Sequence, residues 1–424
     1  MIVSLIAIGL LLGMLILGVP MVAALLIAVS FNFVVGGQWS MMVPQSMVAG
    51  VSQFTLIALP LFVLAGTIMN AGGISGRLFD FARALVGWMR GGLAQVNVLT
   101  SMFFGGMIGS STADLAGSGS IVIPAMKREG YPPEIAASVS ASSSGIGPLI
   151  PPSSPMILYS AVTGTSLGAL FAAGLIPGMI LGALFMILIF VMALRRKWAR
   201  HGDLSAREIL VKGKRAILAF GMPLIIIGGL VFGVFTPSEG GAFAVMYAIA
   251  LSLFVYRTLD LRTLYRAIVS ALMMTGELLV IVSLSFALGA SLSSAHVPQA
   301  LANVIDFFTS DSMLLRLMLL VLLAIIAGMF LDPLIPVLVP VILPTLILYD
   351  IDLLHFGVLM VMAVVIGQLT PPLAIALIIT SRIARTDQMR IFMANMPFFV
   401  TIILFTVVLI LFPQLATWLP SQMR

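Results

Sequence analysis

Residues 145–154 read GIGPLIPPSS, and residues 365–374 read VIGQLTPPLA. Each stretch interrupts a long apolar run with a glycine and then two adjacent prolines, Pro151-Pro152 in the first and Pro371-Pro372 in the second. Proline removes a backbone donor and clashes with the preceding turn, so neither run can continue as one helix. The chain is therefore predicted to contain two helices that are broken in the middle.

The composition around these breaks is that of a membrane protein. Of 424 residues, 61% are hydrophobic and only 8% are charged, whereas a soluble domain carries about 25% charged residues. Runs such as 179–194 and 396–412 hold no charge and approach the roughly 20 apolar residues of a membrane span. They do not alternate apolar with polar residues as the strands of a barrel would. We predict an all-α polytopic membrane protein, and read the apolar N-terminus as a span rather than a signal peptide.

Residue counts exclude several kinds of site. The chain has no cysteine, which excludes disulfides and thiolate sites. Its three histidines, His201, His296 and His355, are far apart and lack a metal-binding spacing. The formal charge of +6 is compatible with a nucleic-acid partner, but in a membrane chain it more often reflects cytoplasmic Lys and Arg.

The two proline pairs belong to an internal repeat. Pro124 lies 27 residues before Pro151, and Pro344 lies 27 residues before Pro371. The same offset superimposes Gly147 on Gly367. We therefore divide the chain into a first repeat at 1–194, a polar basic loop at 195–215 and a second repeat at 216–424. Each repeat is predicted to carry about five crossing helices, an interfacial helix, a re-entrant hairpin and a broken helix. The hairpins are expected at 92–128 and 315–348, and the broken helices at 132–164 and 354–381.

An odd number of crossings places the two repeats in opposite orientations, as in many secondary transporters. The distribution of charge supports this inverted topology. With the loop at 195–215 in the cytoplasm, 19 of the 21 Lys and Arg residues fall on the cytoplasmic side, and only Arg316 and Arg424 fall outside. Both termini then lie outside the cytoplasm. The excess of Lys and Arg is therefore explained by membrane topology and gives no support to nucleic-acid binding.

Polar residues inside the spans are the candidate functional groups. Where a helix is broken, its backbone amides and carbonyls lose their partners, and lipid cannot replace them. Helix breaks therefore occur only inside protein or beside a water-filled cavity. Exposed carbonyls and hydroxyls suit a cation such as Na⁺, and the N-termini of half-helices attract a carboxylate. In the first repeat the candidates are Ser110, Ser111, Thr112, Asp114, Ser142, Ser143, Ser144, Gly145, Gly147, Pro151 and Pro152. In the second they are Gly328, Asp332, Pro333, Gly367, Gln368, Thr370, Pro371 and Pro372.

Structural explanations compete with the functional ones. Gly and Ser also allow close helix packing, and Asp114 or Asp332 could cap a helix near the interface. Glu239 follows Thr236 at a spacing typical of a helix start. Glu277 lies in mid-span with no obvious partner, and the pattern assigns it no role. His296 and His355 are expected at the surface near external helix ends.

Two other classes of function compete with transport. An intramembrane serine protease would need a histidine buried beside the nucleophile, and no histidine lies near Ser110 and Ser111 in sequence. Re-entrant segments also build channels, although a channel has little need for two equivalent hairpins with equally spaced breaks. Transport is the preferred interpretation.

Several motifs resemble the large membrane subunit of TRAP (tripartite ATP-independent periplasmic) transporters. They are GSSTADLAGSGSIVIPAMKREGY (109–131), IGPLIPPSSPMILY (146–159), FTPSEGGAFA (235–244), GMFLDP (328–333) and HFGVLMVMAVVIGQLTPP (355–372). The resemblance begins near PLFVLAG (60–66) and reaches the last helix. One departure is Ala374, where the family commonly has glycine.

The resemblance implies a secondary transporter of the inner membrane that is driven by a sodium gradient and works as an elevator. It also implies two partners, a small membrane subunit of about four helices and a periplasmic substrate-binding protein. The solutes implied are carboxylates, including C4-dicarboxylates and sialic acids. By this analogy Ser110 to Thr112 and Ser142 to Ser144 belong to a first Na⁺ and substrate site, and Gly328, Asp332, Gly367, Thr370 and Pro371 to a second. A standalone sodium–dicarboxylate symporter without a binding protein is the alternative.

Overall fold

The computed structural model describes residues 2–36, 42–198, 205–231, 233–309 and 312–423. Every regular element within these ranges is a helix, which confirms the all-α fold. Arg200 and Arg424, which count among the 21 Lys and Arg residues of the predicted topology, lie outside the described residues, and so does His201.

The first half of the chain contains eleven α-helices and three short irregular turns, a number that refers to the described residues. The α-helices are α1 (Ile2–Ile16), α2 (Met21–Val35), α3 (Met42–Val51), α4 (Ala58–Ala71), α5 (Ile74–Val86), α6 (Gly92–Ile108), α7 (Ser111–Asp114), α8 (Ser120–Arg128), α9 (Pro133–Ser144), α10 (Ser154–Thr163) and α11 (Leu167–Arg195). The turns are 3₁₀ segments at Phe54–Ile57 and Gly147–Leu149 and a π-helical turn at Leu115–Gly119.

The second half follows a similar order. It comprises α12 (Ala206–Val231), α13 (Pro237–Ala250) with a π-helical turn at Leu251–Val255, α14 (Leu261–Ser294), α15 (Val297–Thr309), α16 (Met313–Gly328), α17 (Leu334–Leu348), α18 (Leu353–Gln368), α19 (Ile375–Ala384), α20 (Gln388–Leu411) and α21 (Gln414–Ser421).

Within the described residues, five helical segments are long and apolar enough to cross a membrane. They are Phe54–Ala71, Leu167–Arg195, Pro237–Val255, Leu261–Ser294 and Gln388–Leu411. Several shorter apolar helices accompany them, including α16 to α19. Short helices of this kind are expected where a span is split into a hairpin or a broken helix.

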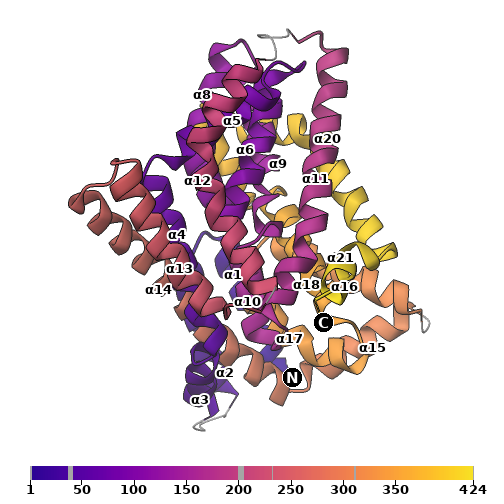
Figure 1. Cartoon of the computed structure of the whole chain (residues 1–424). Helices are drawn as coiled ribbons and strands as arrows, with labels where there is room; N and C mark the ends of the chain where they lie inside the picture. The colour runs from indigo at the N-terminus through magenta and orange to yellow at the C-terminus, as the bar shows by residue number, and fades with distance from the viewer. Residues whose placement is uncertain (1, 37–41, 199–204, 232, 310–311, 424) are drawn as a thin grey trace.

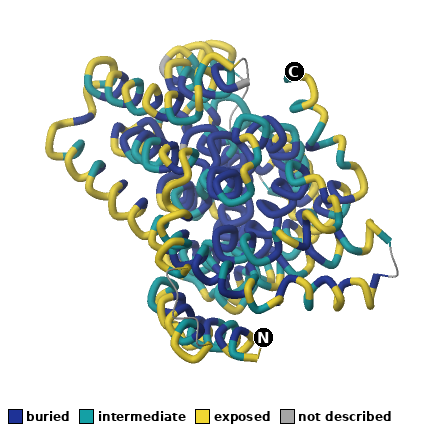
Figure 2. The backbone as a smooth tube through the Cα atoms, turned by 90° about the horizontal axis from the view of Figure 1, so that it is seen from below, coloured by how far each residue is buried: buried dark blue, intermediate teal, exposed yellow. Residues whose placement is uncertain are grey.

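The helices form two packed groups. In the first, α14 packs on α2, α3 and α4, and α13 packs on α4 (Figure 1). In the second, α9 packs on α6, α19 and α20, and α18 packs on α11, α16 and α20. Figure 2 shows the buried helices at the centre with exposed turns around the rim. We refer to α2, α3, α4, α13 and α14 as the scaffold group.

The first halves of the two broken helices form the centre of the core. All residues of α9 from Ile135 to Ser144 are buried, and so are all residues of α18 from His355 to Gly367. A helix that is enclosed on every side presents no solvent-facing stripe. Accordingly, α18 contains no Asp, Glu, Lys or Arg, and up to Gly367 it consists of small and apolar residues and one histidine.

The structure differs from the sequence-based helix ranges at three places. The loop expected at 195–215 is partly helical, because α12 begins at Ala206. The apolar pattern of the sequence predicts a helix over 271–294, but α14 already starts at Leu261. Both extensions carry basic residues on exposed faces. A search for uninterrupted apolar residues therefore does not include them in the helices. Two short helices, α3 and α21, were not expected as separate elements.

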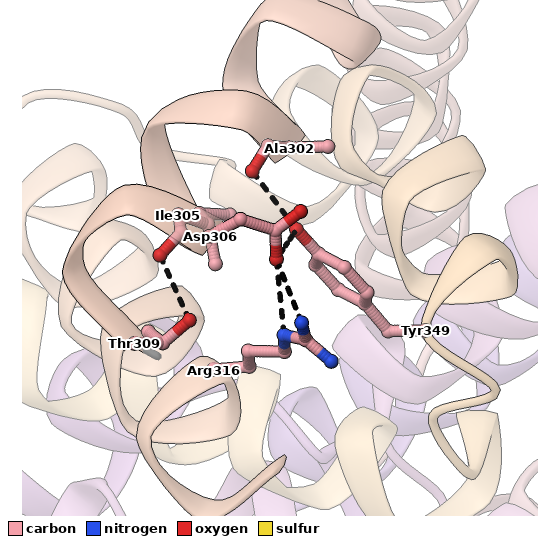
Figure 3. A network of polar contacts seen from close by, with 6 residues as sticks. All are labelled: Ala302, Ile305, Asp306, Thr309, Arg316 and Tyr349. Carbon is pink, nitrogen blue, oxygen red and sulfur yellow. Dashed lines mark hydrogen bonds and ion pairs between the residues drawn. The ribbon is translucent and has the colours of Figure 1, made fainter. Parts of the chain in front are cut away.

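Each half also contains an amphipathic helix before its hairpin. In α5 the buried face includes Leu78 and Phe79, while Asp80 on the other face pairs with Lys212 of α12 at 2.9 Å. In α15, Asp306 accepts hydrogen bonds from Arg316 of α16 at 2.9 and 3.1 Å (Figure 3).

Tyr349 completes the contacts of α15. Its hydroxyl lies 3.0 Å from both the Ala302 carbonyl and an Asp306 carboxylate oxygen, and the Arg316 guanidinium lies 4.6 Å from its ring centre (Figure 3). Together these contacts attach α15 to both helices of the second hairpin.

Glu239 has the structural role that its position suggested. The Thr236 hydroxyl accepts a hydrogen bond from the Glu239 amide at 3.4 Å, and the Glu239 carboxylate accepts one from the Thr236 amide at 2.7 Å. This reciprocal arrangement is a capping box, and it starts α13.

Ala374 begins α19 in the left-handed region, with φ 44° and ψ 54°. This conformation costs an L-residue about 1–2 kcal/mol, and glycine avoids that cost. Glycine also increases the conformational entropy of the unfolded chain, which lowers the stability of the fold by about 0.4–1 kcal/mol. We therefore expect Ala374→Gly to stabilise the protein by about 0.5–1 kcal/mol, measured by thermal unfolding in detergent. Ala363→Gly, inside α18, is the matched control and should destabilise by about 1 kcal/mol. A loss of stability in Ala374→Gly would contradict the left-handed assignment.

Candidate functional site

The tip of the first hairpin contains two polar atoms that no other group satisfies. Ser111 and Asp114 are 3% and 2% exposed. One carboxylate oxygen of Asp114 accepts a hydrogen bond from the Ser118 hydroxyl at 2.5 Å, but its other oxygen and the Ser111 hydroxyl have no hydrogen-bond partner among the described residues. Buried polar atoms are nearly always paired, so this tip has capacity left for a ligand.

Local sequence explains the shape of the tip. Gly109 ends α6 with a φ of 60°, and its carbonyl accepts a hydrogen bond from the Ser154 amide at 3.3 Å. Ser110 then caps α7, its hydroxyl accepting from the Ala113 amide at 3.5 Å and lying 3.1 Å from the Thr112 hydroxyl. The tip thus turns sharply and packs on the start of α10.

The serines at the end of α9 are used within the protein. Ser143 and Ser144 donate to the carbonyls of Ser140 and Ala141, at 3.2 and 2.8 Å, and Ser142 donates to the side-chain oxygen of Asn395 on α20. All three are completely buried. They hold α9 in place and do not line the cavity described below.

Each broken helix is closed by a hydroxyl that donates to a freed carbonyl. At the first break, Ser153 donates to the Pro148 carbonyl at 2.5 Å and caps α10. At the second, Thr370 donates to the Ile366 carbonyl at 2.6 Å. The bonds Pro151-Pro152 and Pro371-Pro372 are both cis, as is Asp332-Pro333.

Pairs of glycines bring each hairpin against a break. A Cβ added to Gly105 of α6 would lie 2.9 Å from the Gly147 Cα. A Cβ added to Gly367 would lie 2.5 Å from the carbonyl carbon of Gly328, at the end of α16. Only glycine permits such backbone contacts. Gly147, Gly328 and Gly367 therefore have a packing role at corresponding places in the two halves, and Gly145 likewise packs closely against Val365.

A cavity of about 550 Å³ joins the two hairpin tips. Ser110, Ser111 and Thr112 line it from the first hairpin, and Asp332 from the second. Of the other residues predicted for the site, Asp114 is buried within the first tip, and the break residues Ser142, Ser143, Ser144, Gly145, Gly147, Pro151, Pro152, Gly328, Gly367, Thr370, Pro371 and Pro372 are not among the lining residues.

The scaffold group supplies polar lining residues that the sequence did not assign to the site. They are Thr67 and Asn70 of α4 and Ser270 and Glu277 of α14. Ser154, at the start of α10, also lines the cavity without having been predicted, whereas Pro333 and Gln368 line it as the sequence predicted. The mid-span charge of Glu277 was a visible signal, but the face on which it lies depends on how α14 packs.

His355 was expected at the surface, and this prediction is wrong. It is 4% exposed, and its Nε2 lies 2.9 Å from the Leu409 carbonyl of α20. Asp352 caps the start of α18, which brings His355 inside the enclosed part of the helix. His296 is exposed, as expected.

Polar contacts connect the hairpin and broken-helix elements of the two halves. Lys127, at the end of α8, donates to the Ala384 carbonyl at the end of α19 at 2.7 Å. Tyr159 of α10 donates to the Leu353 carbonyl of α18 at 2.8 Å. With the contact between Ser142 and Asn395, these bonds hold both halves together behind the cavity.

Comparison with known proteins identifies the family. The family described as tripartite ATP-independent periplasmic transporter, DctM component, matches residues 8–415. The chain belongs to this family. It is therefore the large permease component of a TRAP transporter, a transport protein and not an enzyme.

Individual relatives cover nearly the whole permease. The chain is 35% identical to the sialic acid TRAP transporter large permease protein SiaM of Vibrio cholerae, over 97% of this chain and 96% of that protein. It is 35% identical to the C4-dicarboxylate TRAP transporter large permease protein DctM of Pseudomonas aeruginosa, over 87% of this chain and 86% of that protein. Against the sialic acid TRAP transporter permease protein SiaT of Haemophilus influenzae the identity is 33%, over 96% of this chain but only 66% of that longer protein.

Among solved structures, the YdaH transporter of Alcanivorax borkumensis has the same fold. The TM-score is 0.63 at 14% sequence identity, covering 89% of the permease and 88% of YdaH. At this identity the likeness concerns the fold alone.

Replacing Gly367 by alanine tests the glycine contact at the second break. The added methyl group meets the Gly328 backbone, which cannot rotate away, so Gly367→Ala should destabilise the permease by about 1–3 kcal/mol. Gly76→Ala is the matched control, because a Cβ at Gly76 of α5 meets nothing within 4 Å and should add about 0.4–1 kcal/mol. Thermal unfolding of both variants in detergent is the measurement, and equal stability of the two would refute the close contact.

Proposed function

We propose that the permease takes up a small organic acid across the inner membrane, driven by a Na⁺ gradient and dependent on a periplasmic substrate-binding protein. Carboxylates are the proposed solutes because the SiaM and DctM relatives are named for sialic acid and C4-dicarboxylates. A small membrane subunit completes the proposed tripartite assembly.

The charge of the cavity is the observation that carries the sodium dependence. Asp332 and Glu277 line it, and no Lys, Arg or His is among its described lining residues. An anionic solute entering this cavity meets acidic side chains and no basic side chain to balance its charge. Cations that enter with the solute would balance its negative charge. This requirement couples the entry of the solute to the entry of Na⁺.

The first hairpin tip offers suitable ligands for Na⁺. The unpaired oxygens of Ser111 and Asp114 are a hydroxyl and a carboxylate, and oxygen ligands of this kind suit a hard cation. Asp332 is the corresponding acid of the second hairpin. No cluster of three or more His, Cys, Asp or Glu residues suited to another metal occurs in the described part of the chain.

The N-terminus of α17 is available for the carboxylate of the solute. Ser154 and Pro155 begin α10, Leu334 and Ile335 begin α17, and all four line the cavity. Helix N-termini carry unsatisfied amides and a partial positive charge, which stabilise an anion. At α10 the Ser154 amide donates to the Gly109 carbonyl, the Met156 amide donates to the Ser153 hydroxyl, and Pro155 has no amide hydrogen, so α10 contributes only its dipole. The N-terminus of α17 can therefore bind a carboxylate without a basic side chain.

We further propose that the hairpins and broken helices move together as the elevator past the scaffold group. Hydrogen bonds from Lys127, Ser142 and Tyr159 join these elements into one unit, and α4 and α14 face them across the cavity. The proposed topology has the 195–215 segment in the cytoplasm and both termini in the periplasm.

Uptake into proteoliposomes tests the function and its alternative. With the small subunit, the binding protein and an inward Na⁺ gradient, we expect accumulation of labelled sialic acid or succinate, and collapse of the gradient by a sodium ionophore should abolish it. Accumulation that needs sodium but not the binding protein would favour the standalone symporter instead.

Asp114→Asn tests the sodium site. The change removes the charge and replaces an oxygen ligand by an amide, so the Na⁺ concentration for half-maximal uptake should rise about tenfold or more, since contacts to a charged group contribute about 1.5–3 kcal/mol. Ser120→Ala is the control, because Ser120 lies in the same hairpin and donates only to the Gly117 carbonyl. An unchanged sodium dependence in Asp114→Asn would exclude Asp114 as a ligand.

A further inference from the structure

Glu277 lies on the cavity-facing side of the scaffold helix α14. Ser270, Met274, Glu277 and Ile281, which recur at helical spacing, all line the cavity. Within the described residues the carboxylate of Glu277 forms no hydrogen bond or ion pair. Glu277 is exposed within this chain. An ionisable residue in the middle of a membrane helix is expected to have a functional partner, and the cavity that Glu277 lines is where a solute can supply one.

The other polar residues by which the scaffold group lines this cavity are neutral. Thr67 donates its hydroxyl hydrogen to the Val63 carbonyl at 2.7 Å, which leaves its oxygen as an acceptor. The side-chain oxygen of Asn70 accepts from Ser75 at 2.7 Å, which leaves its amide group as a donor. Thr67, Asn70 and Ser270 thus add neutral hydrogen-bond donors and acceptors to the cavity that Glu277 lines.

We propose that Glu277 is a specificity-determining residue that accepts hydrogen bonds from hydroxyl groups of the solute. The proposal rests on the proposed carboxylate transport and narrows its substrate class. The solute is a polyhydroxylated monocarboxylate, a sugar acid, whose carboxylate is held at the N-terminus of α17 and whose hydroxylated end faces α14. The cavity of about 550 Å³ is in the range that accommodates ligands larger than a four-carbon acid.

A dicarboxylate fits this arrangement poorly. An ionised carboxylate only accepts hydrogen bonds, so a second carboxylate near Glu277 has no hydrogen to donate and carries the same charge. Specificity arises as much from such repulsion as from favourable contacts. Glu277 is thus expected to reject a solute that is acidic at both ends.

Three six-carbon acids test the proposal by ligand-dependent thermal unfolding of the purified full-length chain in Na⁺. Gluconate has one carboxylate and hydroxyls, glucarate has two carboxylates and hydroxyls, and adipate has two carboxylates and no hydroxyls. The apparent Kd of each follows from the shift of the midpoint with its concentration. The native chain should bind gluconate about tenfold or more tightly than glucarate, the size of one hydrogen bond to a charged acceptor.

In E277Q the preference for gluconate over glucarate should fall to about twofold or less, because glutamine carries no charge and its amide can donate to a carboxylate. E277D keeps the charge and should retain the preference. E208Q is the matched control, since it makes the same change at an exposed residue of α12 outside the cavity.

The outcomes separate this inference from the function on which it rests. An unchanged preference in E277Q overturns the inference and leaves the proposed transport intact. A shift in sodium dependence with an unchanged preference also overturns it, and makes Glu277 a cation ligand instead. If none of the three acids stabilises the native chain in Na⁺ while the proteoliposomes still accumulate sialic acid or succinate, the inference fails and the proposed transport stands.

Discussion

The breaks in two buried helices are the constraint on which the rest of the structure depends. A helix that stops inside an apolar environment leaves amides and carbonyls without partners, and lipid offers none. Here the protein supplies them locally: Ser153 donates to the Pro148 carbonyl, and Thr370 donates to the Ile366 carbonyl. The hairpins must then pack directly on the breaks to exclude lipid, and the glycine contacts at Gly105 and Gly367 make this possible. The cavity between the hairpin tips and the scaffold group is a consequence of that packing.

The features that the sequence predicts well are those set by local chemistry. Adjacent prolines after glycine specify a break wherever they occur in a helix, and a span without charge specifies burial in lipid or protein, so the broken helices and the all-helical fold could be predicted. The basic start of α12 and the early start of α14 could not, because the charged faces of these helices are exposed and only the folded chain shows that they continue the spans. His355 illustrates the same limit, since its burial is decided by α20, which lies far away in the sequence.

Two clusters of hydroxyls show why residue type alone does not identify a site. Ser142 to Ser144 are satisfied by carbonyls one turn earlier and by Asn395, so their polarity is consumed in holding α9. Ser111 has the same side chain, but it lies in a tip where the helix begins again, and no carbonyl of a preceding turn is within its reach. Whether a buried serine is satisfied within the protein or keeps an unpaired hydroxyl therefore depends on whether the preceding backbone is helical, which a count of serines cannot reveal.

The acidic residues around the cavity lie on different structural groups, and their charges can therefore have different roles. Asp114 and Asp332 belong to the hairpins, whereas Glu277 belongs to the scaffold group. If the hairpins travel past the scaffold, their acids keep the same neighbours throughout, and a cation bound to them travels with the solute. Glu277 meets the solute only when the hairpins stand beside it. A charge on the fixed side of a moving site thus acts on one stage of transport, and it can select among solutes without altering the ions that accompany them.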